Sequence, residues 1–443
     1  MRTRDVYLSG FLVLALASAR AGETPSSPDA DLARQLNSLG GFRFDRGEYG
    51  RAESLFTRAV ALGQPDAVLN LAATLRAEAR YSEAEAMYQR ALALRESEAP
   101  RSPNRIASAL CGLALLYRDT ARFAEAEKMA RRALDLRQQA AERDETSIAW
   151  TLNLVGMLAQ AQERTAEAAS LFQQALDTAE KAPSPDALTM ADILINMGNA
   201  ERTSGDLGNA ERHLDRAIRE LGDKGDRVRT AAALNGLALV ERARGDFKQA
   251  RLLETRALVS LEAAVGKEHP DYSAALSSLA LVDQDLHDSH KARELYREAL
   301  AIDQRVLGPN HPRVGADLNN LGAAAALQHD YASAESYFRQ ALRLEEERKP
   351  GSVESAFRMA NLAALYVREK RSSEALALYR RAAGILCAED RQGDLRVAAI
   401  LHEYAELLRA AGSFAEAEDA DTRAMHIRVK YVLTNHNGDV GHS

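Results

Sequence analysis

Cysteine, tryptophan and aromatic residues in general are scarce in this chain of 443 residues. It contains two cysteines, one tryptophan and 5% aromatic residues, whereas 46% of its residues are hydrophobic. Two cysteines are too few for a disulfide-stapled fold. A low aromatic content also argues against one large aromatic core and favours close helix packing through alanine. No stretch of the sequence is typical of a β-strand.

An excess of positive charge is missing as well. The formal net charge is −7, and no long run of lysine and arginine offsets it. A nucleic-acid partner is therefore not expected, because binding the phosphate backbone requires a strongly basic face.

Motifs of catalysis are likewise lacking. The sequence contains no phosphate-binding glycine loop, no G-x-S-x-G and no paired-cysteine motif,. His287 and His290 could share a metal only if further ligands came from elsewhere, and we interpret them as part of a polar turn that caps a helix. We predict no enzymatic activity, no metal and no cofactor.

A repeated pattern is the dominant feature of the chain. A small residue recurs ten times, and most neighbouring copies are 42 residues apart. We use this residue as the marker of each repeat. The markers are Ala52, Ala84, Ala126, Ala168, Ala210, Ala250, Ala292, Ala334, Ala375 and Ala417.

Other positions recur in register with the marker. Alanine lies seven residues after every marker, glycine or alanine lies twelve residues before it, and an apolar residue lies sixteen residues before it. In the copy around Ala334, Leu318 and Leu321 share one helical face, as do Phe338 and Ala341,. Each copy therefore predicts two helices joined by a tight turn. Since one such hairpin cannot bury its apolar face alone, neighbouring copies must stack.

The pattern resembles the tetratricopeptide repeat, and its long period resembles the repeats of kinesin light chains. The resemblance is carried by LGPNHP, LNNLG and AESYFRQAL and covers roughly residues 31–430. It implies an all-α fold, a right-handed superhelical solenoid of about ten helix-turn-helix repeats. The sequence departs from the family pattern where the second helix should carry an aromatic residue, at Ala130, Leu214, Glu254 and Asp421.

The repeat also bears on the remaining single residues. Cys111 and Cys387 lie six repeats apart, so a bridge between them is not expected,. His269 and His311 recur because their loop recurs, and each should help to close the joint before a proline. Trp150 opens a first helix and should pack on the neighbouring repeat, although an anchoring role for a ligand is the alternative.

The two ends of the chain differ from the repeats. Residues 1–21 combine Arg2 and Arg4 with a short apolar run and two A-x-A-like triplets, which predicts a secretory signal peptide and an exported, periplasmic or secreted protein,. An uncleaved membrane anchor is the alternative. Residues 22–30 are predicted to be a flexible lead-in, residues 31–430 the solenoid, and residues 431–443 a disordered tail.

Asparagine and arginine recur on the first helices and mark a candidate binding groove. Stacked hairpins curve and create a concave surface, and in relatives of this repeat asparagine in the first helix binds the backbone of an extended peptide. An amide offers both a donor and an acceptor, and arginine binds carboxylates. The candidate residues are Asn70, Asn153, Asn196, Asn235, Asn319, Asn320, Asn361, Arg76, Arg118, Arg202 and Arg242.

Two interpretations of these residues remain open. They bind a partner, or the asparagines bond neighbouring helices while the arginines form surface ion pairs. The predicted function is a non-catalytic scaffold that binds an extended peptide or partner protein. A regulatory subunit of an enzyme complex and a structural spacer are the alternatives.

Overall fold

Twenty α-helices make up the part of the chain that the computed structural model describes, which comprises residues 28–222, 226–388 and 394–436. No strand occurs within these residues, and the predicted all-α solenoid class is confirmed. The first helices of the ten hairpins are α1 Pro28–Asp45, α3 Pro65–Ala77, α5 Pro103–Asp119, α7 Glu145–Ala161, α9 Ala187–Ser204, α11 Arg227–Arg244, α13 Pro270–Asp285, α15 Pro312–Leu327, α17 Val353–Arg368 and α19 Leu395–Ala410. The second helices are α2 Tyr49–Ala61, α4 Tyr81–Ser97, α6 Phe123–Gln138, α8 Thr165–Glu180, α10 Leu207–Leu221, α12 Phe247–Val265, α14 Ser289–Val306, α16 Tyr331–Arg348, α18 Ser372–Ala388 and α20 Phe414–His436.

The ends of this series lie close to the predicted borders of the solenoid. Helix α1 begins at Pro28, inside the segment predicted to be a lead-in, and α20 continues past Lys430 to His436. The predicted signal peptide at 1–21 lies outside the described residues. Within those residues, no helix is both long and apolar enough to cross a membrane.

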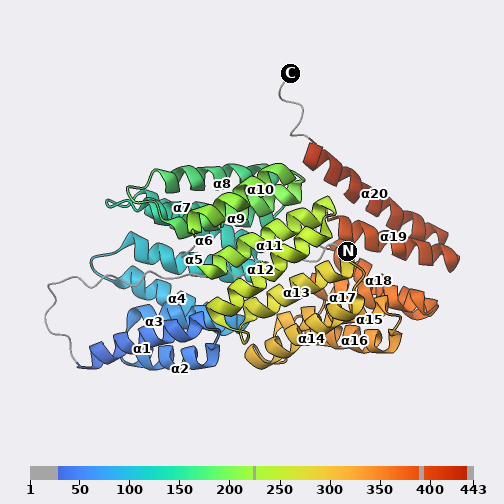
Figure 1. Cartoon of the computed structure of the whole chain (residues 1–443), viewed down its shortest axis with the longest axis horizontal. Helices are drawn as coiled ribbons and strands as arrows, with labels where there is room; N and C mark the ends of the chain where they lie inside the picture. The colour runs from blue at the N-terminus through green and yellow to red at the C-terminus, as the bar shows by residue number, and fades with distance from the viewer. Residues whose placement is uncertain (1–27, 223–225, 389–393, 437–443) are drawn as a thin grey trace, which may run out of the picture. The chain divides into compact units, whose positions relative to one another are not determined.

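The helices form two compact units, and the border between them falls near the end of α13, between Val282 and Asp283. In the first unit, α1 to α12 stack hairpin on hairpin, and in the second unit α15 to α20 do the same (Figure 1).

One left-handed residue makes each turn within a repeat. It lies five residues before the marker and has a φ between 57° and 93°. The ten residues are Gly47, Ala79, Ala121, Glu163, Gly205, Gly245, His287, His329, Lys370 and Gly412. Only four of them are glycine, which alone adopts this conformation without strain. The turn is therefore set by the packing of the two helices and not by glycine.

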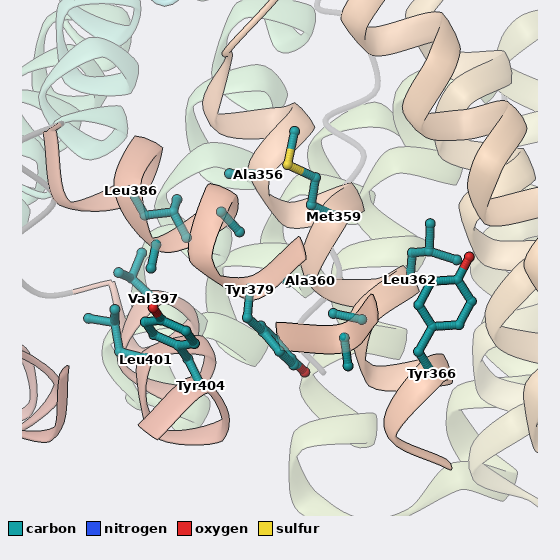
Figure 2. Packing of buried hydrophobic residues seen from close by; sticks show 14 of the residues in the cluster. Ala356, Met359, Ala360, Leu362, Tyr366, Tyr379, Leu386, Val397, Leu401 and Tyr404 are labelled. Carbon is teal, nitrogen blue, oxygen red and sulfur yellow. The ribbon is translucent and has the colours of Figure 1, made fainter. Parts of the chain in front are cut away.

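The second unit shows how its repeats share one core. Figure 2 shows Tyr379 of α18 in the middle of a buried cluster, with Ala360 and Leu362 of α17 on one side and Leu401 and Tyr404 of α19 on the other. The aromatic residue of one repeat thus contacts both its own first helix and the next. Such sharing explains why a single hairpin cannot fold alone.

The four departures from the aromatic pattern have different outcomes. Ala130 and Leu214 are fully buried, so the helices pack closely there. Asp421 forms an ion pair with Arg409 across the last hairpin, and its Oδ1 lies 3.0 Å from His402 Nδ1. Glu254 is fully buried, and its Oε1 accepts a hydrogen bond of 2.7 Å from Asn235 Nδ2.

Candidate functional site

The first helices of neighbouring repeats pack on one another and so form one side of each unit. In the first unit α1 packs on α3, α3 on α5, α5 on α7, α7 on α9 and α9 on α11, and in the second unit α15 packs on α17. The first helices of neighbouring repeats lie closer together than their second helices do. They therefore form the inner wall of each curved stack. All of the candidate asparagine and arginine residues lie on these helices.

The candidate asparagines form pairs that join neighbouring repeats. Asn70 donates from Nδ2 to Asn37 Oδ1 (2.9 Å), and Asn196 donates in the same way to Asn153 (3.1 Å). In the second unit Asn361 donates to Asn319 (2.7 Å). The donor always lies fourteen residues before its marker, and the acceptor lies fifteen residues before the preceding marker.

Each pair leaves two polar atoms unused. Within the described part of the chain, Oδ1 of the donating asparagine and Nδ2 of the accepting asparagine have no protein partner. Asn153 and Asn319 are buried, at 4% and 8% exposure, whereas Asn70, Asn196 and Asn361 are half-buried. The pairs therefore tie the repeats together and still present amide atoms on the inner wall.

Two candidate asparagines lie outside these pairs. Asn235 donates to the buried Glu254 and not to a neighbouring amide. Asn320 is half-buried and forms no hydrogen bond with any described residue. The reason lies in the sequence, because Ser278 and Ser277 occupy the positions where their asparagine partners would be.

The candidate arginines form a row at the C-terminal ends of the first helices. Arg76 of α3 and Arg118 of α5 both bind Asp119, at 2.6 Å and 2.8 Å. Burial opposes the ionised form of Asp119, but Arg118 and Arg76 outweigh it and lower the pKa of this carboxyl. Arg202 of α9 and Arg242 of α11 hold the same position and are half-buried.

Two features of the wall were not predicted from the sequence: a glutamine in the arginine row, and the hydrogen bonds between asparagines of neighbouring repeats. Gln160 of α7 lies in register with Arg118 and Arg202, and its Nε2 is buried without a hydrogen-bond partner among the described residues. The asparagine pairs are visible in the sequence. In each pair, an asparagine fifteen residues before one marker is followed by an asparagine fourteen residues before the next marker.

The histidines have structural roles. The Nδ1 atoms of His269 and His311 accept from the backbone N–H of Asp271 (3.1 Å) and Arg313 (3.2 Å), which caps the helix that follows. His287 supplies the left-handed turn residue between α13 and α14. Among the described residues, no group of three or more His, Cys, Asp or Glu side chains could hold a metal ion.

Comparison with known families agrees with this architecture. The sequence profile of the tetratricopeptide repeat matches five segments, of which the first four overlap, and together they span more than half of the chain. The segments are residues 64–139, 105–181, 147–219, 189–263 and 271–347. No curated protein is significantly similar in sequence.

Several solved structures share parts of the arrangement. BtubC (BKLC) of P. vanneervenii is 25% identical, with a TM-score of 0.42, and the match covers 52% of this chain and 91% of that protein. A kinesin light chain-like protein of Podosopora anserina with nearly identical TPR-like repeats is 22% identical, with a TM-score of 0.39 and coverage of 46% and 96%. A Rap protein complexed with Competence and Sporulation Factor is 16% identical, with a TM-score of 0.48 and coverage of 74% and 99%.

Proposed function

Because the chain belongs to the tetratricopeptide repeat family, whose members are generally non-catalytic scaffolds, we propose that it binds an extended segment of a partner protein along its first helices. The asparagine pairs are the single observation that carries this proposal. Each pair offers one free acceptor and one free donor on the inner wall.

These free atoms complement a peptide backbone. An extended peptide exposes an N–H and a C=O at every residue, which match the free Oδ1 and Nδ2 of a pair. The hydrogen bond within the pair fixes both amides before a ligand arrives, so less side-chain entropy is lost on binding. Repetition along the wall lets affinity accumulate without reading one particular side chain.

The arginine row indicates which charge the bound segment should carry. Arg76 and Arg118 share the single carboxylate of Asp119, which leaves the guanidinium groups in excess there. Arginine binds carboxylates with good geometry. We therefore expect a segment that carries acidic side chains.

The proposal is tested with a displayed library of random peptides. The variant with Asn196→Ala and Asn320→Ala removes one paired and one unpaired amide, and peptides selected by the wild type should bind this variant at least several-fold more weakly. Asn209→Ala is the matched control, because Asn209 lies on the second helix α10 and bonds Asp206 in its own turn. Equal peptide binding by the wild type and the double variant, with both folded, would remove the proposal.

We also propose that the protein is exported by residues 1–21. Arg2, Arg4 and the apolar run that follows them carry this proposal,. N-terminal sequencing of the protein from its native cell tests it, and cleavage after Ala19 or Ala21 is expected. An intact N-terminus on protein recovered from the cytosol would contradict export.

A further inference from the structure

Buried charges occur at several joints between repeats. They lie eleven residues after the marker, near the end of the second helix. Arg95, Arg137, Asp303 and Glu345 occupy this position, and each is at most 8% exposed. Removing a charge from water is costly unless an opposite charge compensates for it.

Three of these four residues have such a partner. Arg95 binds Asp66 and Glu98. Asp303 binds Arg313 at 2.9 Å, and Glu345 binds Arg348 at 2.5 Å.

Arg137 of α6 is the exception. Its Nη1 donates to the carbonyl oxygen of Ser147 (3.0 Å) and to Thr151 Oγ1, and its Nη2 donates to Ser108 Oγ (3.4 Å). All of these acceptors are neutral, and Nε is buried without a partner. Among the described residues, no carboxylate forms an ion pair with this guanidinium, although it is only 7% exposed.

The preceding repeat shows which group is missing. Arg95 and Arg137 are equivalent, and the residue equivalent to Asp66, the partner of Arg95, is Ser108. Ser108 lies on α5 and contacts Arg137 through the long hydrogen bond from Nη2. A serine thus occupies the position that holds the carboxylate one repeat earlier.

The same comparison shows that a carboxylate at this position stays open to solvent while it binds the buried arginine. The side chain of Asp66 is 48% exposed although it binds an arginine side chain that is only 4% exposed. Ser108 is half-buried and lies on a first helix, as Asp66 does. Helices α5, α6 and α7, which surround Arg137, pack against one another (Figure 1).

The two acidic residues at the start of α7 are engaged elsewhere, and Glu145 pairs with Arg143 at 3.2 Å. Asp144 caps this helix, and its Oδ1 accepts from the backbone N–H of Ser147 at 3.3 Å. It forms no ion pair with Arg137 within the described residues. The missing negative charge is therefore not supplied by the helix that follows.

We propose that Arg137 and Ser108 form a carboxylate-binding subsite, which takes an acidic side chain of the segment bound in the groove. This proposal rests on the proposed function for the source of the carboxylate. The ligand carboxylate would take the role that Asp66 has one repeat earlier and accept from Nη2 of Arg137, displacing the long hydrogen bond to Ser108, whose own proton is donated to Asn104 O. The subsite differs from the arginine row at the ends of the first helices, since Arg137 lies on a second helix.

The subsite is tested first on the protein alone. Ser108→Asp supplies the missing carboxylate within the chain, and Ser108→Asn has the same shape without the charge. We expect a melting temperature roughly 2–4 °C higher for Ser108→Asp than for Ser108→Asn, because the buried cation gains a partner.

Small anions then identify the ligand chemistry. Thermal unfolding is measured in sodium acetate, sodium sulfate and sodium chloride at equal ionic strength, for the wild type and for Ser108→Asp. Acetate should raise the melting temperature of the wild type more than that of Ser108→Asp. The general effect of the salt is the same for both proteins and drops out of the comparison. Asp66→Ser should gain a weaker dependence on acetate at Arg95, because Glu98 still binds this arginine.

Three results would overturn the subsite. The two Ser108 variants could be equally stable, acetate could stabilise the wild type and Ser108→Asp to the same extent, or sulfate alone could show the difference. The last result would indicate a site for a phosphate-like anion and not for a carboxylate.

The link to the groove is tested separately. Peptides selected from the random library by the wild type should carry Asp or Glu at one fixed position, and Ser108→Asp should select peptides without this preference. If the salt experiments succeed and no peptide binds, the proposed function fails while the subsite stands. If peptides bind without an acidic preference, the subsite is not part of the groove.

Discussion

Several single residues in this protein depart from the repeat pattern. Glu254 departs most, because it buries a carboxyl group where the repeat has an aromatic ring. It is fully buried and has one hydrogen bond, from Asn235. Its Oε2 is buried without a partner among the described residues. Burial raises the pKa of this carboxyl to about 8, and the hydrogen bond from Asn235 opposes the shift only in part,.

This raised pKa makes stability depend on pH. The unfolded chain loses the proton of Glu254 near its ordinary pKa of 4.5, whereas the folded chain keeps it up to about 8. Between these values the folded state binds more protons, so the free energy of unfolding falls as the pH rises through this window. At pH 7 the cost is on the order of 3 kcal/mol.

Glu254→Gln should remove this cost, because the amide carries no charge at any pH. We expect little change in the free energy of unfolding at pH 5 and a gain of a few kcal/mol at pH 8, measured by denaturant unfolding. Glu262→Gln on the exposed face of the same helix is the control. The same pH dependence of stability in Glu254→Gln and in the wild type would contradict the raised pKa of Glu254.

Gly322 shows how closely neighbouring helices approach at the small residue of the first helix. A Cβ atom added there would lie 2.7 Å from the ring of Phe338. Gly315 lies in the same helix, and a Cβ atom added to it would meet only Ala341 O at 4.0 Å.

Gly322→Ala should therefore destabilise the protein by about 1–3 kcal/mol through overpacking, whereas Gly315→Ala should stabilise it by about 0.5–1 kcal/mol through helix propensity. Denaturant unfolding of the two variants measures the difference. A shift of the same sign in both would show that the contact with Phe338 does not limit this position.

At the scale of helices, ion pairs connect the second helices of successive repeats. An arginine just before one second helix binds a glutamate of the preceding one, as in Arg80–Glu53 (2.7 Å), Arg122–Glu85 (2.8 Å), Arg164–Glu127 (2.5 Å) and Arg371–Glu335 (2.8 Å). Between α14 and α16 the charges are reversed, since Arg293 binds Asp330 at 2.7 Å. One geometry thus accepts either order of charge.

Reversing this pair tests whether the positions are equivalent. Asp330→Arg alone should cost about 2 kcal/mol, because it places two arginines together and removes the cap that Asp330 provides to Ser333 N–H,. Adding Arg293→Glu should recover about 1 kcal/mol, the coupling expected for a partly exposed pair. Asp330→Asn keeps a capping side chain and serves as the control. No recovery in the double variant would mean that the pair contributes no stability.

At the scale of the whole molecule, the first unit turns back on itself. The turn of the first repeat contacts the loop before α13, which precedes the seventh repeat (Figure 1). Gly47 is buried there, with φ of 71°, and a Cβ atom added to it would lie 2.8 Å from the His269 ring.

Gly47→Ala should cost more stability than Gly245→Ala. Both substitutions force a left-handed residue to carry a side chain, at about 1–2 kcal/mol. Only Gly47 faces a neighbour, since nothing lies within 4 Å of a Cβ atom added at Gly245. Thermal unfolding of both variants measures the excess, and equal losses would mean that the contact with His269 is dispensable.

The sequence by itself determined the repeat, the ten hairpins and the all-α class. These follow from spacings within about forty residues, where small and apolar side chains set the helix faces and the packing of each pair. The sequence also determined the positions of the asparagines on the first helices, but not the groups to which they bond.

Only the tertiary structure decided that Asn196 bonds Asn153, that Arg137 lacks the partner that Arg95 has, and that Gly47 contacts His269. These contacts depend on the rotation between successive repeats. A small rotation at each joint adds up along the stack, and local patterns of side chains do not encode that sum.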